Sequence, residues 1–249
     1  MQDPTKRFSD RVEDYVKYRP EYPDEIYGFL KKETGIDEGS VIADIGSGTG
    51  ISSLLFLKNG HKVIGVEPND EMRKAAEDYL SSHENFVSLN GKAEETGLDN
   101  KSVDIIIAGQ AFHWFDVEKA KQEFKRVLNP DGYVILFWNE RLSEGDEFLS
   151  QYDLLIKKYS DEYETVKHRN IDEKIFKKFF NEYKIKFFEN SQSFDFDGLK
   201  GRLLSSSYTP KDGEKYDAMI VELGLLFDRF HKNGQVKILY KTGIYYGRL

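Results

Sequence analysis

Three glycines and an acid form the most chemically informative pattern in this sequence. The run V-I-A-D-I-G-S-G-T-G places Asp44 just before Gly46, Gly48 and Gly50. Because glycine has no β-carbon, the chain can turn sharply there and its backbone can approach a ligand closely. Glu67 lies 21 residues after Gly46, at the end of a second apolar run, where an acid can accept the hydroxyl hydrogens of a ribose. The spacing therefore predicts one nucleoside site built from the loop and the acid.

The same spacing disfavours the common nucleotide cofactors. A dinucleotide fingerprint needs G-x-G-x-x-G, but the third glycine comes one residue early and Ile51 occupies its place. Asp44 would repel a pyrophosphate and attract an ammonium group. The sequence has no G-x-x-x-x-G-K-[ST] motif for a triphosphate. The ligand we expect is therefore an adenosine compound with an ammonium group and no phosphate.

S-adenosylmethionine has this chemistry, and the chain resembles the class I methyltransferases that use it. The likeness lies in the glycine motif, in Glu67 as the ribose-binding acid, and in G-K-A-E at 91–94 as the adenine-side segment. Residues 111–116, A-F-H-W-F-D, resemble the small-molecule branch that includes trans-aconitate and ubiquinone-biosynthesis methyltransferases. These matches cover about the first 140 residues. Weaker likenesses occur in Y-R-P-E-Y-P at 18–23 and L-L-S-S-S-Y at 203–208.

Composition narrows the class of protein. The 249 residues are 39% apolar and 14% aromatic, enough to fill one large α/β core. The 36 basic and 44 acidic residues give a net charge of −8, which disfavours nucleic acid as a partner. Without cysteine there is no disulfide, no thiolate metal site and no cysteine nucleophile. The start of the chain lacks the apolar core of a secretion signal, and no apolar run could span a bilayer. We expect a cytoplasmic enzyme without a metal, as a monomer or homodimer.

Hydrophobic periodicity predicts alternating strands and helices. The expected strands are 41–45, 63–67, 86–89, 103–108, 133–138, 184–189 and 236–246. The expected helices are 9–18, 24–34, 51–59, one capped by Asn69 or Asp70 and running to Leu80, 117–128, 171–183 and 214–232, with a turn at 129–132. This alternation predicts an α/β fold, a Rossmann-like doubly wound sheet with ligands at the carboxyl ends of its strands. The resemblance implies seven strands with an antiparallel last strand.

We expect a single domain over residues 1–249. Residues 1–39 would form an N-terminal helical cap and 40–140 the cofactor-binding core. Residues 141–235 would form a substrate-side helical insertion that includes one strand of the sheet, and 236–249 the closing strand.

Residues near the ends of the first four strands are the candidate cofactor ligands. They are Arg19, Asp44, Gly46, Ser47, Gly48, Thr49, Gly50, Glu67, Pro68, Met72, Ala93, Glu94, Gln110 and Ala111. Ser47 and Thr49 either cap the following helix or reach the cofactor. Met72 is a core residue, an adenine neighbour or both. The resemblance implies that Ala93 and Glu94 bind the adenine amino group. Arg19 either clamps a carboxylate, of the cofactor or of an acidic substrate, or lies on the surface.

Candidate residues for the acceptor and for catalysis lie elsewhere in the chain. His113 is the candidate general base, since its ordinary pKa of about 6.5 suits that role; alternatively it only satisfies a backbone carbonyl. Tyr15, Trp114, Arg141 and Tyr208 are candidate substrate residues. The [ND]-P-P-[YF] segment with which related enzymes hold planar nitrogen acceptors is absent after the fourth strand.

The sequence thus predicts methyl transfer from S-adenosylmethionine to a small molecule, at oxygen, nitrogen or carbon, by in-line displacement. Alignment of the reactants supplies much of such a reaction's rate, so no elaborate acid–base apparatus is required. Three alternatives stay open: a non-catalytic adenosyl-ligand-binding module, an RNA methyltransferase, which the acidic balance opposes, and an NAD-dependent oxidoreductase, which the glycine spacing opposes.

Overall fold

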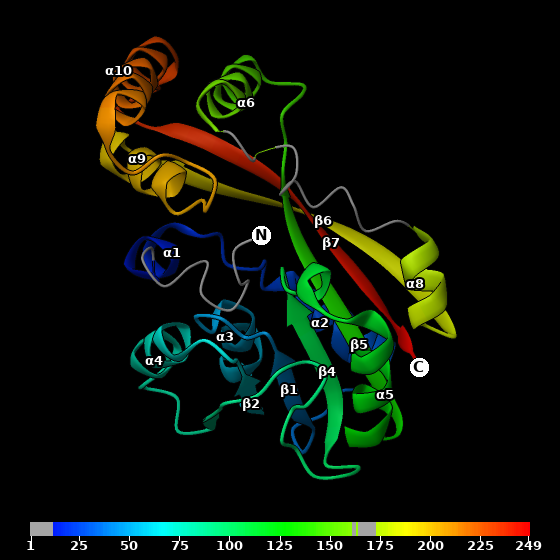
Figure 1. Ribbon diagram of the computed structural model, residues 1–249. Helices are drawn as coiled ribbons and strands as arrows, with labels where there is room; N and C mark the ends of the chain where they lie inside the picture. The colour runs from blue at the N-terminus through cyan, green and yellow to red at the C-terminus, as the bar shows by residue number, and fades with distance from the viewer. Residues whose placement is uncertain (1–11, 161–162, 164–172) are drawn as a thin grey trace.

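The computed structural model describes residues 12–160, 163 and 173–249, and within them a seven-stranded sheet of order β3-β2-β1-β4-β5-β7-β6 (Figure 1). The strands are β1 (Val41–Ile45), β2 (Lys62–Val66), β3 (Phe86–Leu89), β4 (Val103–Gly109), β5 (Leu128–Arg141), β6 (Glu182–Phe194) and β7 (Val236–Arg248). Strands β1 to β5 are parallel, and β7 is antiparallel to both β5 and β6. The predicted Rossmann-like sheet with an antiparallel last strand is confirmed.

Helices connect the strands largely where the periodicity predicts them. They are α1 (Val12–Tyr18), α2 (Glu25–Thr34), α3 (Ile51–Leu57), α4 (Asp70–Tyr79), the short 3-10 helix η2 (Phe112–Trp114), α5 (Val117–Val127), α6 (Glu147–Tyr159), α8 (Glu173–Phe179), α9 (Phe196–Leu204) and α10 (Gly213–Phe230). The prediction of one helix over 171–183 is wrong at its end, because β6 begins at Glu182. Residues 9–11, 171 and 172 of two predicted helices lie outside the described part of the chain.

Side chains on each strand alternate between two hydrophobic layers. On β4, Ile105 and Ile107 pack with α2 and α3, whereas Ile106 and Ala108 pack with α5 and α8 on the other face. All four of these side chains are buried. A central strand buried on both faces reads as a continuous apolar run, which is why β4 has no polar alternation in its sequence. The two layers fix the carboxyl ends of the strands relative to the loops that follow them.

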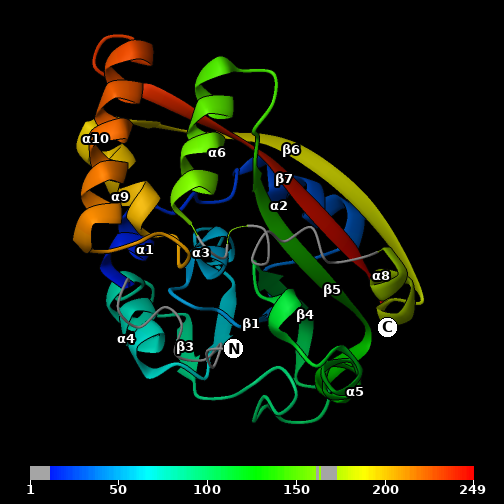
Figure 2. The same cartoon turned by 45° about the horizontal axis from the view of Figure 1, so that its top comes forward.

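A third hydrophobic cluster lies over the carboxyl ends of the strands. Strand β7 pairs with β5 from Tyr240 onward, but it pairs with β6 from Val236. The β6–β7 ribbon therefore extends beyond β5, and α6, α9 and α10 pack around this extension (Figures 1 and 2). Helix α6 packs on α10, and α9 packs on α1. We call α1, α6, α9 and α10 the cap.

None of the described helices combines the length and apolar composition needed to cross a membrane.

Strand β5 starts earlier than the sequence indicates. The predicted turn at 129–132 lies inside β5, where Leu128 pairs with Val103 and Tyr133 pairs with Ile105. The extra residues form an irregularity in the ladder, and Asp131 there has a φ of +70°. The turn residues thus bend the strand locally instead of preceding it.

The loop after β1 owes its shape to backbone conformations that favour glycine. Gly50 is the N-cap of α3, with a φ of +83° and no side-chain capping bond. A β-carbon at this position would lie 2.5 Å from Cδ1 of Leu80, which is 1% exposed at the end of α4. Neither Ser47 nor Thr49 therefore caps α3. By contrast, Asn69 caps α4 as predicted, because its side chain accepts a hydrogen bond from the N–H of Met72 at 2.9 Å.

We expect Gly50→Ala to destabilise the fold more than Gly60→Ala. Gly60 has a similar φ of +85° but no atom within 4 Å of its hypothetical β-carbon. In both variants the alanine must adopt a left-handed backbone conformation, which costs about 1 to 2 kcal/mol of unfolding free energy. Only in Gly50→Ala does the new methyl group also overpack its neighbours, which costs about 1 to 3 kcal/mol more. Urea denaturation of the two variants measures the difference. Equal losses of unfolding free energy would show that the contact with Leu80 does not constrain the loop.

Candidate functional site

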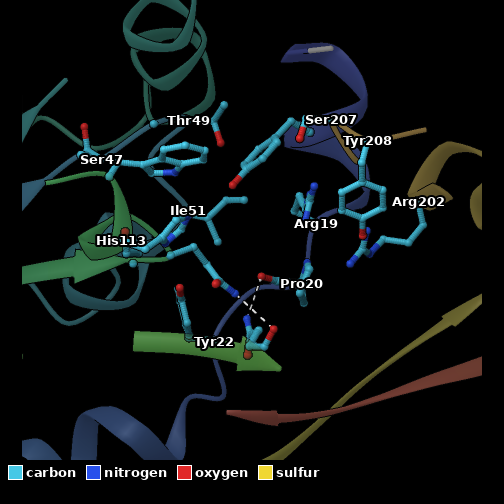
Figure 3. Close-up of a pocket in the computed structure, with 18 residues that line it drawn as sticks. Arg19, Pro20, Tyr22, Ser47, Thr49, Ile51, His113, Arg202, Ser207 and Tyr208 are labelled. Carbon is cyan, nitrogen blue, oxygen red and sulfur yellow. Dashed lines mark hydrogen bonds between the residues drawn. The ribbon is translucent and has the colours of Figure 1, made fainter. Parts of the chain in front are cut away.

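Two adjoining cavities open at the carboxyl ends of the parallel strands. The cap-side cavity, drawn in Figure 3, measures about 900 Å³ with open solvent at its mouth included, and its walls include Arg19, Ser47, Thr49, His113, Arg202 and Tyr208. The sheet-side cavity, about 820 Å³ on the same measure, has walls that include Glu67, Pro68, Met72, Ala93, Glu94 and Ala111. Both are lined by Tyr15, Gly46, Gly48, Gly109, Gln110 and Trp114. Because they share these lining residues, the two cavities adjoin one another.

The glycine loop forms part of the wall between the cavities. Gly46 and Gly48 have φ values of +68° and +55°. A β-carbon on Gly46 would lie 2.7 Å from the β-carbon of Ala111, at the end of the neighbouring β4. The N–H of Gly46 donates to the carbonyl oxygen of Val66 at 2.8 Å, which fixes the loop to the end of β2. Only glycine at position 46 allows the loop and the end of β4 to approach this closely.

The carboxylate of Glu67 joins two loops. Its Oε2 accepts a hydrogen bond from the N–H of Gly48 at 3.0 Å, and its Oε1 accepts one from the N–H of Asn69 at 2.9 Å. The residue is 9% exposed, and burial raises the pKa of its carboxyl although both N–H groups and Arg73 lower it. A carboxylate oxygen has two lone pairs, so each can accept one further hydrogen bond from the sheet-side cavity. This is the bonding capacity that a ribose diol requires.

Gln110 has a strained backbone where the two cavities meet. Its φ is +57°, uncommon for a residue other than glycine and frequent at functional sites. Its N–H donates to the carbonyl oxygen of Phe137 at 3.0 Å, and its Nε2 donates to that of Asn139 at 3.2 Å. Strand β5 thus holds Gln110 in this conformation, so that its backbone lines both cavities.

Comparison with known proteins agrees with this geometry. The family model described as a methyltransferase domain matches residues 43–136. An uncharacterized methyltransferase-like protein of Schizosaccharomyces pombe is 36% identical over 137 residues, which are 55% of this chain and 52% of that protein. The chain spans about half the length of these curated relatives. These matches indicate a methyltransferase domain over residues 43–136.

Solved structures extend the likeness of fold beyond the methyltransferase domain. A proposed type II methyltransferase of Anaeromyxobacter dehalogenans superimposes with a TM-score of 0.69 at 21% identity, covering 93% of this chain and 98% of that one. The geranyl diphosphate C-methyltransferase of Streptomyces coelicolor, solved with S-adenosyl-L-homocysteine, gives a TM-score of 0.50 at 13% identity, covering 90% of this chain and 79% of that one. At these identities the likeness concerns the fold alone. The predicted trans-aconitate and ubiquinone-biosynthesis branch stays a prediction.

The structure brings most of the predicted site residues together. Among the candidate cofactor ligands, Glu67, Pro68, Met72, Ala93, Glu94 and Ala111 line the sheet-side cavity, Arg19, Ser47 and Thr49 line the cap-side cavity, and Gly46, Gly48 and Gln110 line both. Among the candidate substrate and catalytic residues, Tyr15 and Trp114 line both cavities, and His113 and Tyr208 line the cap-side cavity. The ring of His113 lies 4.6 Å from that of Trp114. Met72 is 6% exposed, so it is at once a core residue and part of a cavity wall.

Three predicted residues line neither cavity. Gly50 packs on α4, as described above. Arg141 is committed elsewhere, because its Nη2 contacts Oδ1 of Asp153 at 2.7 Å and the hydroxyl of Tyr163 at 2.9 Å. Asp44 lies fully buried beneath the glycine loop, where its Oδ2 accepts hydrogen bonds from Ser52 at 2.6 Å and from Ser53 at 2.7 Å. The expectation that its carboxylate faces a ligand is therefore not what the structure shows.

Sequence reasoning missed several residues of the cavity walls. Arg202 lies on α9, in a segment that carries no specific motif, so only the folded chain places it in the cap-side cavity. Tyr22 and Asn139 also line this cavity. Tyr22 belongs to the Y-R-P-E-Y-P run, whose weak likeness to the methyltransferase branch was the sequence signal for this residue. Asn139 ties the run to β5, since its Nδ2 donates to the carbonyl oxygen of Pro20 at 3.3 Å.

Buried polar atoms around the glycine loop fit S-adenosylmethionine. Oγ1 of Thr49, Oε1 of Gln110 and Nε of Arg19 are buried without a hydrogen-bond partner in the described part of the chain. A buried polar group without a partner is costly, and these atoms belong to walls of the cap-side cavity. They offer acceptors for an ammonium group and a donor for a carboxylate, the two ends of an amino acid. No cluster of side chains suited to a metal ion occurs among the described residues.

Burial makes Asp44 sensitive to pH. It raises the pKa of this carboxyl from 3.8 to about 6, although the hydroxyls of Ser52 and Ser53 lower it. Because the pKa in the folded protein is the higher one, the stabilisation is complete below pH 3.8 and is lost as the pH rises through 6. We expect Asp44→Asn, whose side chain stays neutral, to gain roughly 2 kcal/mol of unfolding free energy relative to the unmodified protein between about pH 4.5 and about pH 7.5.

Urea denaturation at the two pH values, without ligand, measures this change. Asp78→Asn, at an exposed position, is the control and should show no comparable dependence on pH. A difference between Asp44→Asn and the unmodified protein that is the same at both pH values would contradict a raised pKa at Asp44.

Proposed function

We propose that the protein transfers a methyl group from S-adenosylmethionine to a small molecule bound in the cap-side cavity. The observation that carries this proposal is the junction of the two cavities at Gly46, Gly48 and Gln110. One ligand can lie in the sheet-side cavity and reach this junction, while a second meets it from the cap. A concave cavity beneath the cap suits a small molecule better than a polymer.

The sheet-side cavity is the proposed adenosine site. Glu67 would bind the ribose hydroxyls, and Met72 would contact the purine face. Ala93 and Glu94 would lie beside the adenine amino group. Oε1 of Glu94 already accepts a hydrogen bond from the N–H of Asp116 at 2.7 Å, which holds this loop against the start of α5. The methionine portion would extend past the glycine loop toward Arg19.

When bound, S-adenosylmethionine supplies a sulfonium-activated methyl group. The backbone of Gln110 would fix the position of the junction, and the ring of Trp114, which is 37% exposed, would cover part of it. Such positioning accounts for a large part of catalysis, on the order of 7 to 11 kcal/mol in well-oriented reactions. If the acceptor carries a proton, His113 would take it at the junction, a contribution of about 10²- to 10⁴-fold. A carboxylate acceptor needs no such base.

Cofactor affinity tests the proposed role of Glu67. We expect Glu67→Ala to weaken S-adenosylhomocysteine binding at least about tenfold, because it removes a charged acceptor for two hydroxyls. The same change frees the N–H groups of Gly48 and Asn69, so Glu67→Gln is measured in parallel, since it retains one carbonyl oxygen. Glu84→Ala, an exposed acid, is the control. Calorimetry showing the same affinity for Glu67→Ala and the unmodified protein would reject the site.

Product analysis tests catalysis itself. We expect the protein, incubated with S-adenosylmethionine carrying a deuterated methyl group and a yeast or bacterial metabolite extract, to yield a labelled small molecule detectable by mass spectrometry. The Glu67→Ala variant is the control for background labelling. An unlabelled extract despite bound cofactor would identify an adenosyl-ligand-binding module. Label found only in an added RNA fraction would identify an RNA methyltransferase.

A further inference from the structure

Arg202 is a buried cation without a carboxylate partner among the described residues. It lies on α9, is 7% exposed and lines the cap-side cavity. Its Nε donates to the hydroxyl of Tyr240 at 3.0 Å, and that hydroxyl donates to Oε1 of Gln192 at 2.8 Å. This chain of hydrogen bonds orients the guanidinium through one nitrogen only.

The other edge of this guanidinium has little bonding. Nη1 lies 3.4 Å from the hydroxyl oxygens of Ser205 and of Ser206, which is long for a hydrogen bond. Nη2 donates to no atom of the described residues. A fork of two parallel N–H groups is the geometry that binds a planar oxyanion bidentately.

The fold holds a second arginine next to Arg202. Gly201 precedes Arg202 and Tyr18 precedes Arg19, and a β-carbon on Gly201 would overlap the ring of Tyr18. Helices α1 and α9 therefore meet at these two positions. Burial lowers the pKa of Arg19, and the neighbouring charge of Arg202 lowers it further. Nη2 of Arg19 donates to the carbonyl oxygen of Ser205 at 2.8 Å, which joins the two arginine environments.

Neither of these two arginines has a carboxylate partner among the residues that the structure describes. Arg141, at the end of β5, does have one, because it pairs with Asp153 at 2.7 Å. Burying a charge without a counterion is costly, and a ligand that supplies the counterion recovers that cost on binding. Unlike Arg141, Arg19 and Arg202 therefore lie where the described residues supply no carboxylate.

We propose that Arg202 binds a carboxylate of the methyl acceptor, and hence that the acceptor is a small organic acid. This inference rests on the function proposed above. In Figure 3 Arg19 lies between the glycine-loop residues and Arg202, so it is placed to bind the carboxylate of the methionine portion. Arg202, farther from the loop, then faces the acceptor. Tyr208 lies beside both arginines and forms part of the same wall.

Calorimetry on the unmodified protein is the first test. The protein is saturated with S-adenosylhomocysteine and titrated with succinate, citrate, benzoate, their amides and inorganic phosphate. We expect at least one carboxylate to bind with a dissociation constant below about 1 mM and its amide to bind at least about tenfold more weakly. Equal binding of acid and amide, no binding of any acid, or preference for phosphate would each overturn the proposal. Failure of S-adenosylhomocysteine itself to bind would instead reject the proposed function.

Variants then identify the residue responsible. We expect Arg202→Gln to weaken the carboxylate about tenfold or more while S-adenosylhomocysteine affinity changes less than about twofold. Arg202→Lys keeps the charge but loses the two parallel N–H groups. Its carboxylate affinity should therefore lie between those of the unmodified protein and of Arg202→Gln. Arg229→Gln removes an exposed arginine of α10 and is the control. Thermal unfolding confirms that each variant is folded. Unchanged carboxylate affinity in folded Arg202→Gln or Arg202→Lys would overturn the assignment.

Discussion

The whole site depends on one buried carboxylate that accepts hydrogen bonds from the loops after two neighbouring strands. Glu67 directly follows β2, and its two oxygens accept hydrogen bonds from the N–H groups of Gly48 and Asn69. Charge-assisted hydrogen bonds of this kind offset part of the cost of burying the acid. They also fix the glycine loop relative to the start of α4, so that the two walls of the sheet-side cavity are held together. A ligand that bonds to this carboxylate therefore meets a preformed site.

The glycine loop also packs closely against the elements on either side of it. Gly46 lies against Ala111 at the end of β4, and Gly50 lies against Leu80 at the end of α4. Both contacts are too close for a side chain at the glycine position, so the loop after β1 lies directly against the end of β4 and against α4. Gln110 is held in its strained conformation by its hydrogen bonds to β5. The junction of the cavities is thus built mainly from backbone, which moves less than side chains do.

The sequence predicted the features that depend on local order along the chain. The strands and helices from β1 to α5 followed from hydrophobic periodicity and capping residues, and the acid after β2 followed from its distance to the glycines. Features that depend on distant pairings were missed. Arg202 enters the cavity because β6 and β7 extend past β5. It also depends on the packing of α9 on α1, which brings together residues about 180 positions apart in the sequence. Arg141 was a candidate substrate residue, and nothing local in the sequence reveals its pairing with Asp153.

The net charge of the protein and the charge inside the cap-side cavity have opposite signs. The net charge of −8 gives an average field that repels large anions at a distance. Inside the cap-side cavity the charges of Arg19 and Arg202 have no carboxylate partners among the described residues, and low-dielectric walls strengthen their field. Salt screens the outer field within about 10 Å but screens a buried pair far less. A small acid that enters the cavity therefore gains attraction that a polyanion at the surface never reaches, so the same chain can select for charge and against size.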